Sequence, residues 1–508
     1  MSAMMNLQQA AAWLESVQWV VDGLEDSRIE IQRVHTDTRT LAPGDLFVAL
    51  RGERFDGNDF LAEARARGAV AAICQGDGAF EKLRQAGLPG LVVPDAKQAL
   101  AQLATHWRAQ FSLPLIAVTG SNGKTTVTQM IASILRAAQP QACLATQGNL
   151  NNDIGVPLTV LGLRAHHKVA VVELGMNHPG EIAQLAAIAR PTVALVNNAQ
   201  REHLEFMETV TAVAQENGAV IDALPADGVA VFPVDDAYSA LWAAKAGARA
   251  CVCFGQPSVI ASCPNPVQMS HTDIESCGAD FSPPWSTEVD PTKDAVRATQ
   301  AVWSGAAWRV SAMTPQGELH YALHIAGAHN VKNSLAAVAC ALAAGVPLVA
   351  IAAGLAAFEP VKGRSRALLV QQSGRAITLV DDTYNANPDS VRAAIEVLAA
   401  LPKPRLLVLG DMGEVGNQGP QFHAEALQLA LARQIEKIIV TGSACAQAAV
   451  PFKAIEVHAQ MADVQAAVLA ALPSVASVLV KGSRFMKMER VVEAIVQASQ
   501  PVKEAAPC

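Results

Sequence analysis

Residues 119–126 read Thr119-Gly120-Ser121-Asn122-Gly123-Lys124-Thr125-Thr126. An apolar run at residues 115–118 precedes this loop, and residues 127–138 show helical periodicity. A glycine-rich loop between a strand and a helix lets backbone N–H groups approach phosphate oxygens, and the helix N-terminus favours negative charge. The loop is one residue shorter than the commoner G-x-x-x-x-G-K-[ST] pattern, but its chemistry is the same. We therefore predict a nucleotide phosphate loop, with Lys124 on the β- and γ-phosphates and the Thr125 hydroxyl on Mg²⁺.

Buried-strand patterns alternate with helical patterns along the chain, and a second alternating series begins near residue 361. Short apolar runs of this kind are typical of parallel strands that are covered on both faces. We predict an α/β protein of three domains. These are a small α/β domain at residues 1–112, a central parallel sheet of the P-loop ATPase type at 113–360, and a Rossmann-like open sheet at 361–508. The predicted strands that follow the phosphate loop lie at residues 169–172, 193–196, 376–380, 405–409, 437–440 and 477–480.

The composition excludes several classes of protein. The chain has 508 residues, 51% of them hydrophobic and 17% charged, with a net charge of −8. These values argue against global disorder and against nucleic-acid binding driven by bulk charge. Nine cysteines without regular spacing argue against a disulfide scaffold and favour a reducing cytoplasm. Four of them (Cys251, Cys253, Cys263 and Cys277) share one stretch, where we prefer thiols in a loose segment to a zinc site because no C-x-x-C pair is present.

Three other segments need an interpretation. Residues 1–23 have no basic region ahead of an apolar one, so we predict an amphipathic helix and no signal peptide. Residues 334–358 carry no charge, but they are mostly alanine and Gly345-Val346-Pro347 divides them. We predict two buried helices there, joined by a turn, and no membrane span. Residues 256–299 are rich in proline and serine, and we predict an irregular loop.

Polar side chains follow several of the predicted strands where each strand ends. Ligands of open α/β sheets bind at the carboxyl ends of strands, so these residues predict a site between two domains. Glu173 ends the strand at 169–172, and His203 follows the strand at 193–196. Each could be an additional Mg²⁺ ligand. Alternatively, Glu173 could be a solvated carboxylate and His203 a surface histidine. Their places near the strand ends that face the phosphate loop favour the metal.

Two common classes of phosphate-binding protein do not fit the chain. A protein kinase would carry the H-R-D and D-F-G motifs, and neither is present. A GTPase would carry a guanine-binding Asn-Lys-x-Asp segment, and none occurs.

Taken together, the motifs resemble the ATP-dependent Mur ligases of peptidoglycan synthesis across most of the chain. Three stretches, at residues 151–157, 173–182 and 381–388, are similar to the branch of the family that adds D-alanyl-D-alanine. The motifs that carry the resemblance are Thr36-Asp37-Thr38-Arg39, residues 45–52, the phosphate loop, Gly148-Asn149-Leu150-Asn151-Asn152, the stretches just given, His329-Asn330, Lys362-Gly363-Arg364, residues 410–414 and Lys481-Gly482-Ser483-Arg484.

The resemblance implies roles for individual residues. Lys124, Glu173 and His203 would be catalytic, and Thr125, Glu173 and His203 would hold Mg²⁺. The UDP-sugar substrate would contact Thr36, Asp37, Arg39, Asn149, Asn151 and Asn152. ATP would contact Gly120, Ser121, Asn122, Gly123, Lys124, Thr125, Thr126, Asn330, Arg364, Asp382 and Asn385. A hinge would lie near residues 360–363.

The resemblance also implies a reaction. ATP would phosphorylate the carboxylate of UDP-N-acetylmuramoyl-tripeptide, and the amine of D-alanyl-D-alanine would attack the acyl phosphate. We expect a cytoplasmic monomer with small-molecule substrates, no nucleic acid and no membrane span. The alternatives are a sister ligase that adds a single amino acid, a folylpolyglutamate synthase-like enzyme, and a catalytically idle nucleotide-binding partner protein. The segment at residues 36–39 argues against the folate enzyme, because that branch lacks a UDP-sugar domain.

One position departs from the family pattern. The family often carries a carbamylated lysine fourteen residues after the histidine that corresponds to His203, and it helps to place a second Mg²⁺. Here that residue is Asn217, and no lysine lies between Lys168 and Lys245. Asn217 could contribute its amide oxygen, a carboxylate such as Glu216 could substitute, or His203, phosphate and water could hold the ion. We expect activity without carbamylation.

Overall fold

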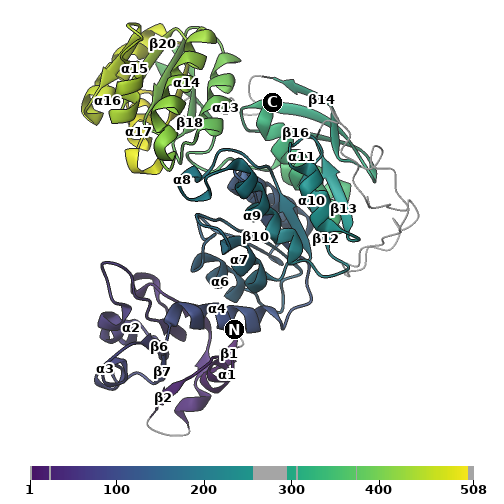
Figure 1. Ribbon diagram of the computed structural model, residues 1–508, viewed down its shortest axis with the longest axis vertical. Coiled ribbons are helices and arrows are strands. Elements are labelled where there is room, and N and C mark those ends of the chain that lie inside the picture. Colours follow the sequence, from purple (N-terminus) through teal and green to yellow (C-terminus); the bar gives the residue numbers. More distant parts are fainter. Residues whose placement is uncertain (1–2, 22–24, 256–294, 305–306, 373, 502–508) are drawn as a thin grey trace.

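The computed structural model describes residues 3–21, 25–255, 295–304, 307–372 and 374–501. Three α/β domains follow one another along the long axis of the molecule, from the purple N-terminal domain through the teal central domain to the yellow-green C-terminal domain (Figure 1). Each domain is built around its own main sheet. The predicted fold class is confirmed.

The N-terminal domain contains a five-stranded sheet of order β2-β7-β6-β5-β4 and a β1-β3 pair. Its elements are β1 (Met5–Asn6), α1 (Leu7–Ala12), β2 (Gln18–Val20), η1 (Asp26–Arg28), β3 (Glu30–Ile31), β4 (Arg33–His35), η2 (Thr38–Thr40), β5 (Asp45–Val48), η3 (Gly57–Phe60), α2 (Leu61–Ala66), β6 (Ala71–Gln75), α3 (Ala79–Ala86), β7 (Gly90–Val93) and α4 (Ala96–Arg108).

The predicted helix at residues 1–23 is wrong for the part that the structure describes. Asn6 and Gln9 form a capping box that begins α1, and this helix has only six residues. The chain then enters β2, which pairs antiparallel with β7. Pairing with a strand some 70 residues away, which no local pattern shows, outweighs the helical periodicity.

The central domain contains a parallel six-stranded sheet of order β13-β12-β11-β8-β10-β9 and an antiparallel sheet of order β14-β15-β16. Its elements are β8 (Leu115–Thr119), α5 (Lys124–Ala138), β9 (Cys143–Ala145), α6 (Gly155–Leu161), β10 (Val169–Glu173), α7 (Glu181–Ala189), β11 (Val193–Val196), α8 (Leu204–Met207), α9 (Val210–Asp222), β12 (Val229–Pro233), α10 (Ser239–Ala246), β13 (Ala250–Phe254), β14 (Arg297–Trp303), β15 (Trp308–Thr314), β16 (Gly317–Leu323), α11 (Ala328–Ala343) and α12 (Leu348–Ala356).

The three strands predicted here, beginning at residues 115, 169 and 193, are confirmed. Both faces of the sheet are covered, since Leu115 and Ala117 belong to one apolar cluster and Ile116 and Val118 to another. The helix after the phosphate loop begins at Lys124, three residues earlier than the periodicity indicated.

Residues 334–358 form the end of α11 and all of α12, so the two predicted helices are confirmed. Gly345 lies between them in the left-handed region, with a φ of 78°. Among the described residues, no helix is both long and apolar enough to cross a membrane.

The predicted loop at residues 256–299 needs a correction at its end. Residues 256–294, with Cys263 and Cys277, lie outside the described part of the chain. Residues 297–299 belong to β14, which pairs with β15. Cys251 and Cys253 are buried in β13 and do not lie in a loose segment.

The C-terminal domain contains a seven-stranded sheet of order β21-β20-β19-β22-β18-β17-β23. The first five of these strands are parallel, and β17 and β23 are antiparallel to their neighbours. All four predicted strands are confirmed. The elements are β17 (Arg366–Gln372), β18 (Arg375–Asp382), α13 (Pro388–Ala399), β19 (Arg405–Leu409), η4 (Gly416–Gln418), α14 (Gly419–Ala432), β20 (Lys437–Thr441), α15 (Ser443–Ala449), β21 (Ile455–His458), α16 (Met461–Ala471), η5 (Leu472–Ser474), β22 (Ser477–Lys481), η6 (Arg484–Met486), α17 (Glu489–Ala498) and β23 (Gln500–Pro501).

Candidate active site

The predicted phosphate loop joins β8 to α5 at the centre of the parallel sheet. Gly120 and Gly123 have φ values of 125° and 84°, which side chains rarely allow. A Cβ on Gly123 would also lie 2.7 Å from the Oδ1 of Asn333, so the close approach of α11 requires glycine there. The geometry turns the chain so that α5 begins at Lys124.

A cavity of about 1550 Å³ brings most of the predicted site residues together. Gly120 is buried under the loop and does not line the cavity, and Thr36, Asp37 and Arg39 lie elsewhere, in the N-terminal domain. The predicted residues that line the cavity are Ser121, Asn122, Gly123, Lys124, Thr125, Thr126, Asn149, Asn151, Asn152, Glu173, His203, Asn330, Arg364, Asp382 and Asn385.

Lys124 is held at the mouth of the loop by a carboxylate that sequence analysis missed. Its Nζ lies 2.6 Å from Oε1 of Glu202 and donates to the carbonyls of Gly120 and Ser121 at 2.5 and 3.1 Å. Both side chains are nearly buried. The ammonium is therefore fixed close to the start of α5, where an anionic ligand would be attracted.

Thr125 and Glu173 meet as predicted for a magnesium site. The Thr125 hydroxyl and the Asn151 amide both donate to Oε1 of Glu173, at 3.0 and 2.8 Å. Glu173 is 1% exposed, and its Oε2 has no hydrogen-bond partner among the described residues. Carboxylate and hydroxyl oxygens are the ligands that Mg²⁺ prefers, and an unpartnered buried oxygen is costly without a cation. The residues present thus fit a magnesium ion.

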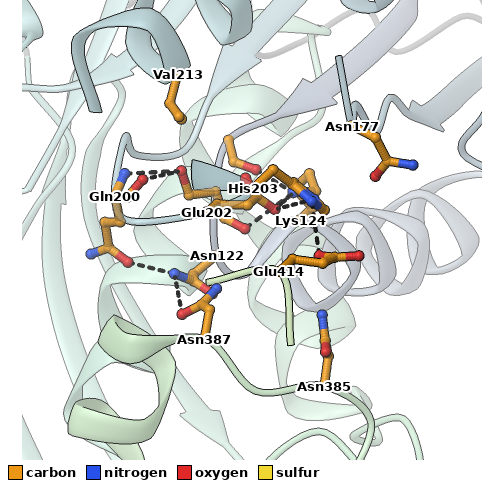
Figure 2. A network of polar contacts seen from close by, with 12 residues as sticks. Asn122, Lys124, Asn177, Gln200, Glu202, His203, Val213, Asn385, Asn387 and Glu414 are labelled. Carbon is orange, nitrogen blue, oxygen red and sulfur yellow. Dashed lines mark hydrogen bonds and ion pairs between the residues drawn. The ribbon is translucent and has the colours of Figure 1, made fainter. Parts of the chain in front are cut away.

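His203 lies between the central and C-terminal domains (Figure 2). Its Nδ1 is 2.8 Å from Oε2 of Glu414, and its Nε2 is 3.6 Å from Oε1 of Glu202. The contact with His203 holds the pKa of Glu414 below its usual value. His203 and Glu414 both have positive φ values, 50° and 57°, so each sits on a tight turn.

The charged segment around His203 is only partly exposed, since Glu205 and Glu208 face solvent whereas Glu202 is buried and Arg201 is half-buried. Arg201 donates to both carboxylate oxygens of Asp389, at 3.1 and 3.0 Å, and contacts Glu425 at 3.2 Å. Its guanidinium also lies 5.0 Å from the centre of the Phe422 ring. These partners belong to α13 and α14, so Arg201 forms an interdomain contact.

The phosphate loop itself contacts the C-terminal domain. The Nδ2 of Asn387 donates to Oδ1 of Asn122 at 2.9 Å, and Asn122 donates to Oε1 of Gln200 at 2.7 Å (Figure 2). Asn387 is the N-cap of α13, which begins with a capping box. A side chain of the loop is thus tied to the start of a helix in another domain.

The C-terminal residues predicted to contact ATP form a polar cluster at the end of β18. The Nζ of Lys481 lies 2.6 Å from Oδ2 of Asp382 and donates to the carbonyl of Asn385 at 2.9 Å. The Arg364 guanidinium lies over the Tyr384 ring, 4.0 Å from its centre. The cluster faces the phosphate loop across the cavity.

Asn330 belongs to the opposite wall. It lies in the first turn of α11 and accepts a hydrogen bond from Nδ2 of Asn333 at 2.9 Å. Asn333 in turn accepts from Asn197 at 3.0 Å, so a chain of amides connects α11 with the end of β11.

The residues predicted for the UDP-sugar substrate occupy two places. Asn152 accepts from the N–H groups of Ile154 and Gly155 at the start of α6, and the amide of Asn151 contacts Glu173. Asn149 is exposed at the cavity.

The second place lies in the N-terminal domain, beyond β4. Asp37 caps η2, and the hydrogen bonds from Arg39 lower its pKa to about 2. Thr36 precedes this pair and Thr38 is buried.

The hydrogen bonds of Asn217 and Glu216 bear on two of the three hypotheses for the second metal. Asn217 is buried in α9, its Oδ1 accepts from the N–H of Gly120 at 2.7 Å, and its Nδ2 donates to Val213 at 3.0 Å. Glu216 accepts from the N–H groups of Gly180 and Ile182, both at 2.8 Å. Both side chains are therefore engaged in supporting the backbone, which favours neither as a metal ligand.

The sequence analysis missed other residues that line the cavity. Lys97 on α4 pairs with Asp153 at 2.7 Å. Trp303 and Trp308 stand 5.4 Å apart, centre to centre, and the Trp308 Nε1 is buried without a partner among the described residues. Two tryptophans close together at 303 and 308 were the only available signal.

Three family models match successive parts of the chain. They are described as Mur ligase family, catalytic domain at residues 30–108, Mur ligase middle domain at 118–273, and Mur ligase, glutamate ligase domain at 365–484.

Known proteins match over nearly the whole length. The UDP-N-acetylmuramoyl-tripeptide–D-alanyl-D-alanine ligase of Escherichia coli (strain K12) is 37% identical over 477 residues, which cover 93% of this chain and 95% of the relative. A crystal structure of MurF from Acinetobacter baumannii has a TM-score of 0.81 and 32% identity, and the match covers 97% and 99% of the two chains. MurF ligase from Thermotoga maritima, solved in complex with ADP, shares the fold with a TM-score of 0.71 and 23% identity, and the match covers 92% and 97%.

Proposed function

This chain belongs to the Mur ligase family, and we propose that it joins D-alanyl-D-alanine to UDP-N-acetylmuramoyl-tripeptide at the expense of ATP. The products are the UDP-muramoyl-pentapeptide, ADP and phosphate. The observation that supports this most strongly is the single cavity lined by the phosphate loop, the segment at 149–152 and the cluster at 382–385. The name of the Escherichia coli relative supports the choice of amine.

The chemistry requires activation of a carboxylate, because oxide is a poor leaving group. Transfer of the ATP γ-phosphoryl group to the tripeptide carboxylate gives an acyl phosphate, and the amine of D-alanyl-D-alanine attacks its carbonyl. The tetrahedral intermediate collapses to the amide and releases phosphate. Lys124 neutralises charge on the transferred group, so catalysis consists mainly of positioning and charge stabilisation.

Thr125, Glu173 and His203 would hold Mg²⁺, which would supply further positive charge at the phosphate oxygens. Asn330, Arg364, Asp382 and Asn385 would contact ATP with the loop residues. Thr36, Asp37 and Arg39 would bind the UDP end of the substrate, and Asn149, Asn151 and Asn152 would also contact the substrate. Water must be kept from the acyl phosphate, so the C-terminal domain would close on the site about a hinge near residues 360–363.

We further propose domain limits at residues 1–112, 113–360 and 361–508, and a monomer that acts in the cytoplasm. The nine irregularly spaced cysteines support a reducing compartment.

The test is phosphate release from ATP with Mg²⁺, UDP-N-acetylmuramoyl-tripeptide and D-alanyl-D-alanine, omitting each substrate in turn, with mass detection of the product. We expect release that needs both substrates and a pentapeptide product. Turnover with a single amino acid instead would identify a sister ligase. The absence of turnover with any amine would favour an idle nucleotide-binding protein.

A further inference from the structure

We propose that Glu202 is a ligand of a second Mg²⁺ ion, held together with His203 beside the phosphate loop. The inference rests on the proposed function, because the phosphate oxygens of bound ATP would complete the site. It assigns a role to a residue that no sequence motif pointed to.

The first argument is an unpartnered oxygen. Glu202 is 8% exposed, and its Oε2 is buried without a hydrogen-bond partner among the described residues. Its Oε1 lies 2.6 Å from Nζ of Lys124 and 3.6 Å from Nε2 of His203. Ligands of an octahedral Mg²⁺ ion are about 3 Å apart when adjacent and about 4 Å apart when opposite. The 3.6 Å between Oε1 of Glu202 and Nε2 of His203 falls between these two values, so a small shift of either side chain would let both bind one ion.

The second argument is the orientation of the imidazole. Glu414 lies 2.8 Å from Nδ1 of His203, on the side away from Glu202, although the two groups do not meet the angles of a hydrogen bond (Figure 2). A carboxylate at one ring nitrogen favours the proton there and leaves the lone pair of the other nitrogen for a metal. Glu414 thus directs Nε2 toward the oxygen of Glu202.

The third argument is charge balance when nucleotide binds. Lys124 is the one ammonium or guanidinium group that contacts Glu202 in the described part of the chain. Phosphates that take Lys124 leave a buried carboxylate without a cation, which is unfavourable. A divalent ion between Glu202, His203 and phosphate restores the balance. Lys124 and the ion are therefore alternative partners of one carboxylate.

The other candidates are engaged elsewhere. Asn217 and Glu216 both accept from backbone N–H groups, and Lys245 pairs with Asp222 at 2.6 Å. Glu202, in contrast, has one carboxylate oxygen without a hydrogen-bond partner among the described residues, and this oxygen could bind the ion.

The experiment counts bound ions directly. Wild type, Glu202→Gln and the matched control Glu208→Gln, which changes an exposed glutamate on the same segment, are titrated with Mn²⁺ by electron paramagnetic resonance, with a non-hydrolysable ATP analogue present. We expect two ions in wild type and control, and a loss of at least about tenfold in the affinity of the second ion in Glu202→Gln. Glu202→Asp, which keeps the carboxylate, should bind the second ion with intermediate affinity.

Two results would overturn the proposal. One is a single ion in the wild type. The other is unchanged Mn²⁺ binding in Glu202→Gln with tighter binding of the analogue, because Glu202 would then only restrain Lys124. The titration needs neither tripeptide nor dipeptide, so failure of the proposed amine specificity would leave it unaffected. Repeating it in CO₂-depleted buffer should change nothing, since no carbamate is involved.

Discussion

The central domain is joined to its two neighbours by different chemistry. Toward the N-terminal domain it shares one apolar cluster, in which Leu103 and Trp107 of α4 join Val160 and Leu185 of the central domain. The C-terminal domain has two apolar clusters of its own, whose buried members all follow residue 369. It contacts the central domain mainly through ionic and amide pairs, such as Arg201 with Asp389, and Leu204 of α8 packs against one of the two clusters.

This difference shows which junction can open. Separating the N-terminal domain would expose apolar surface, which costs about 25 cal/mol per Å². Polar contacts exchange with water, so each contributes only about 0.5–1.5 kcal/mol. The polar junction also includes the phosphate loop, through Asn122, and the metal-site candidate His203. We therefore expect the C-terminal domain to move more readily than the N-terminal domain when nucleotide binds.

The largest effect is expected at the phosphate loop. Lys124→Ala removes the ammonium that balances phosphate charge, so we expect product formation to fall by about 10³-fold or more. The midpoint of thermal unfolding should fall by a few degrees, because the nearly buried carboxylate of Glu202 loses its cation, but the protein should stay folded at the assay temperature. Both quantities are measured on purified protein, by phosphate release and calorimetry. Lys82→Ala, at an exposed pair with Asp59, is the control and should retain full activity. Turnover in Lys124→Ala would refute the assigned role.

The same contrast explains what the sequence could predict. Parallel strands buried on both faces are continuous apolar runs, so β8, β10, β11, β19 and β22 were predicted to within a residue. The phosphate loop follows β8 directly and needs only local pattern. The sheets and the phosphate loop could therefore be predicted from the sequence.

The polar junction could not be predicted from the sequence, because its partners are far apart in the chain. Arg201 meets Asp389 across 188 residues, and Glu202 meets Lys124 across 78. In the sequence, Arg201 and Glu202 lie in a run of mixed charges without periodicity, which is typical of a solvated surface. The short β1, β2 and β14 were missed for a related reason, since distant pairing decides them. The predicted domain limits and the hinge at 360–363 stay predictions.

A second prediction concerns the apolar junction. Trp107 is buried, and its Nε1 donates to the carbonyl of Leu163 in the central domain at 3.1 Å. Trp107→Ala should lower the free energy of unfolding by about 3–5 kcal/mol, because it leaves a cavity and an unpaired carbonyl. We expect calorimetry to show the N-terminal and central domains unfolding together at a lower temperature. The C-terminal transition should not move. Trp19→Ala, at a partly exposed tryptophan, is the control, and independent unfolding of the N-terminal domain would contradict the shared core.

A third prediction concerns the polar junction. Arg201→Gln loses both ionic contacts, with Asp389 and with Glu425. We expect a larger radius of gyration by small-angle X-ray scattering, and a several-fold rise in the KM for ATP. The free energy of unfolding should change by only about 1–2 kcal/mol. Arg392→Gln removes an exposed arginine from the same carboxylate within one domain and should leave the domains docked. A compact Arg201→Gln would show that other contacts suffice.

The smallest effect should come from pH. Burial raises the pKa of Asp389, but hydrogen bonds from Arg201 outweigh it, and the pKa of Glu414 is lowered by His203. A carboxylate whose pKa is lower in the docked state stabilises docking fully at pH values above its ordinary pKa. This stabilisation is lost as the pH falls through the lowered pKa. Docking should thus stay constant from pH 7 to about 5 and weaken below about 4, as measured by energy transfer between labels on the central and C-terminal domains. Labels across the apolar junction should report no change in that range. If the N-terminal domain separated from the central domain before the C-terminal domain did as the pH falls, the comparison would be reversed. The ionic junction would then be the stronger of the two.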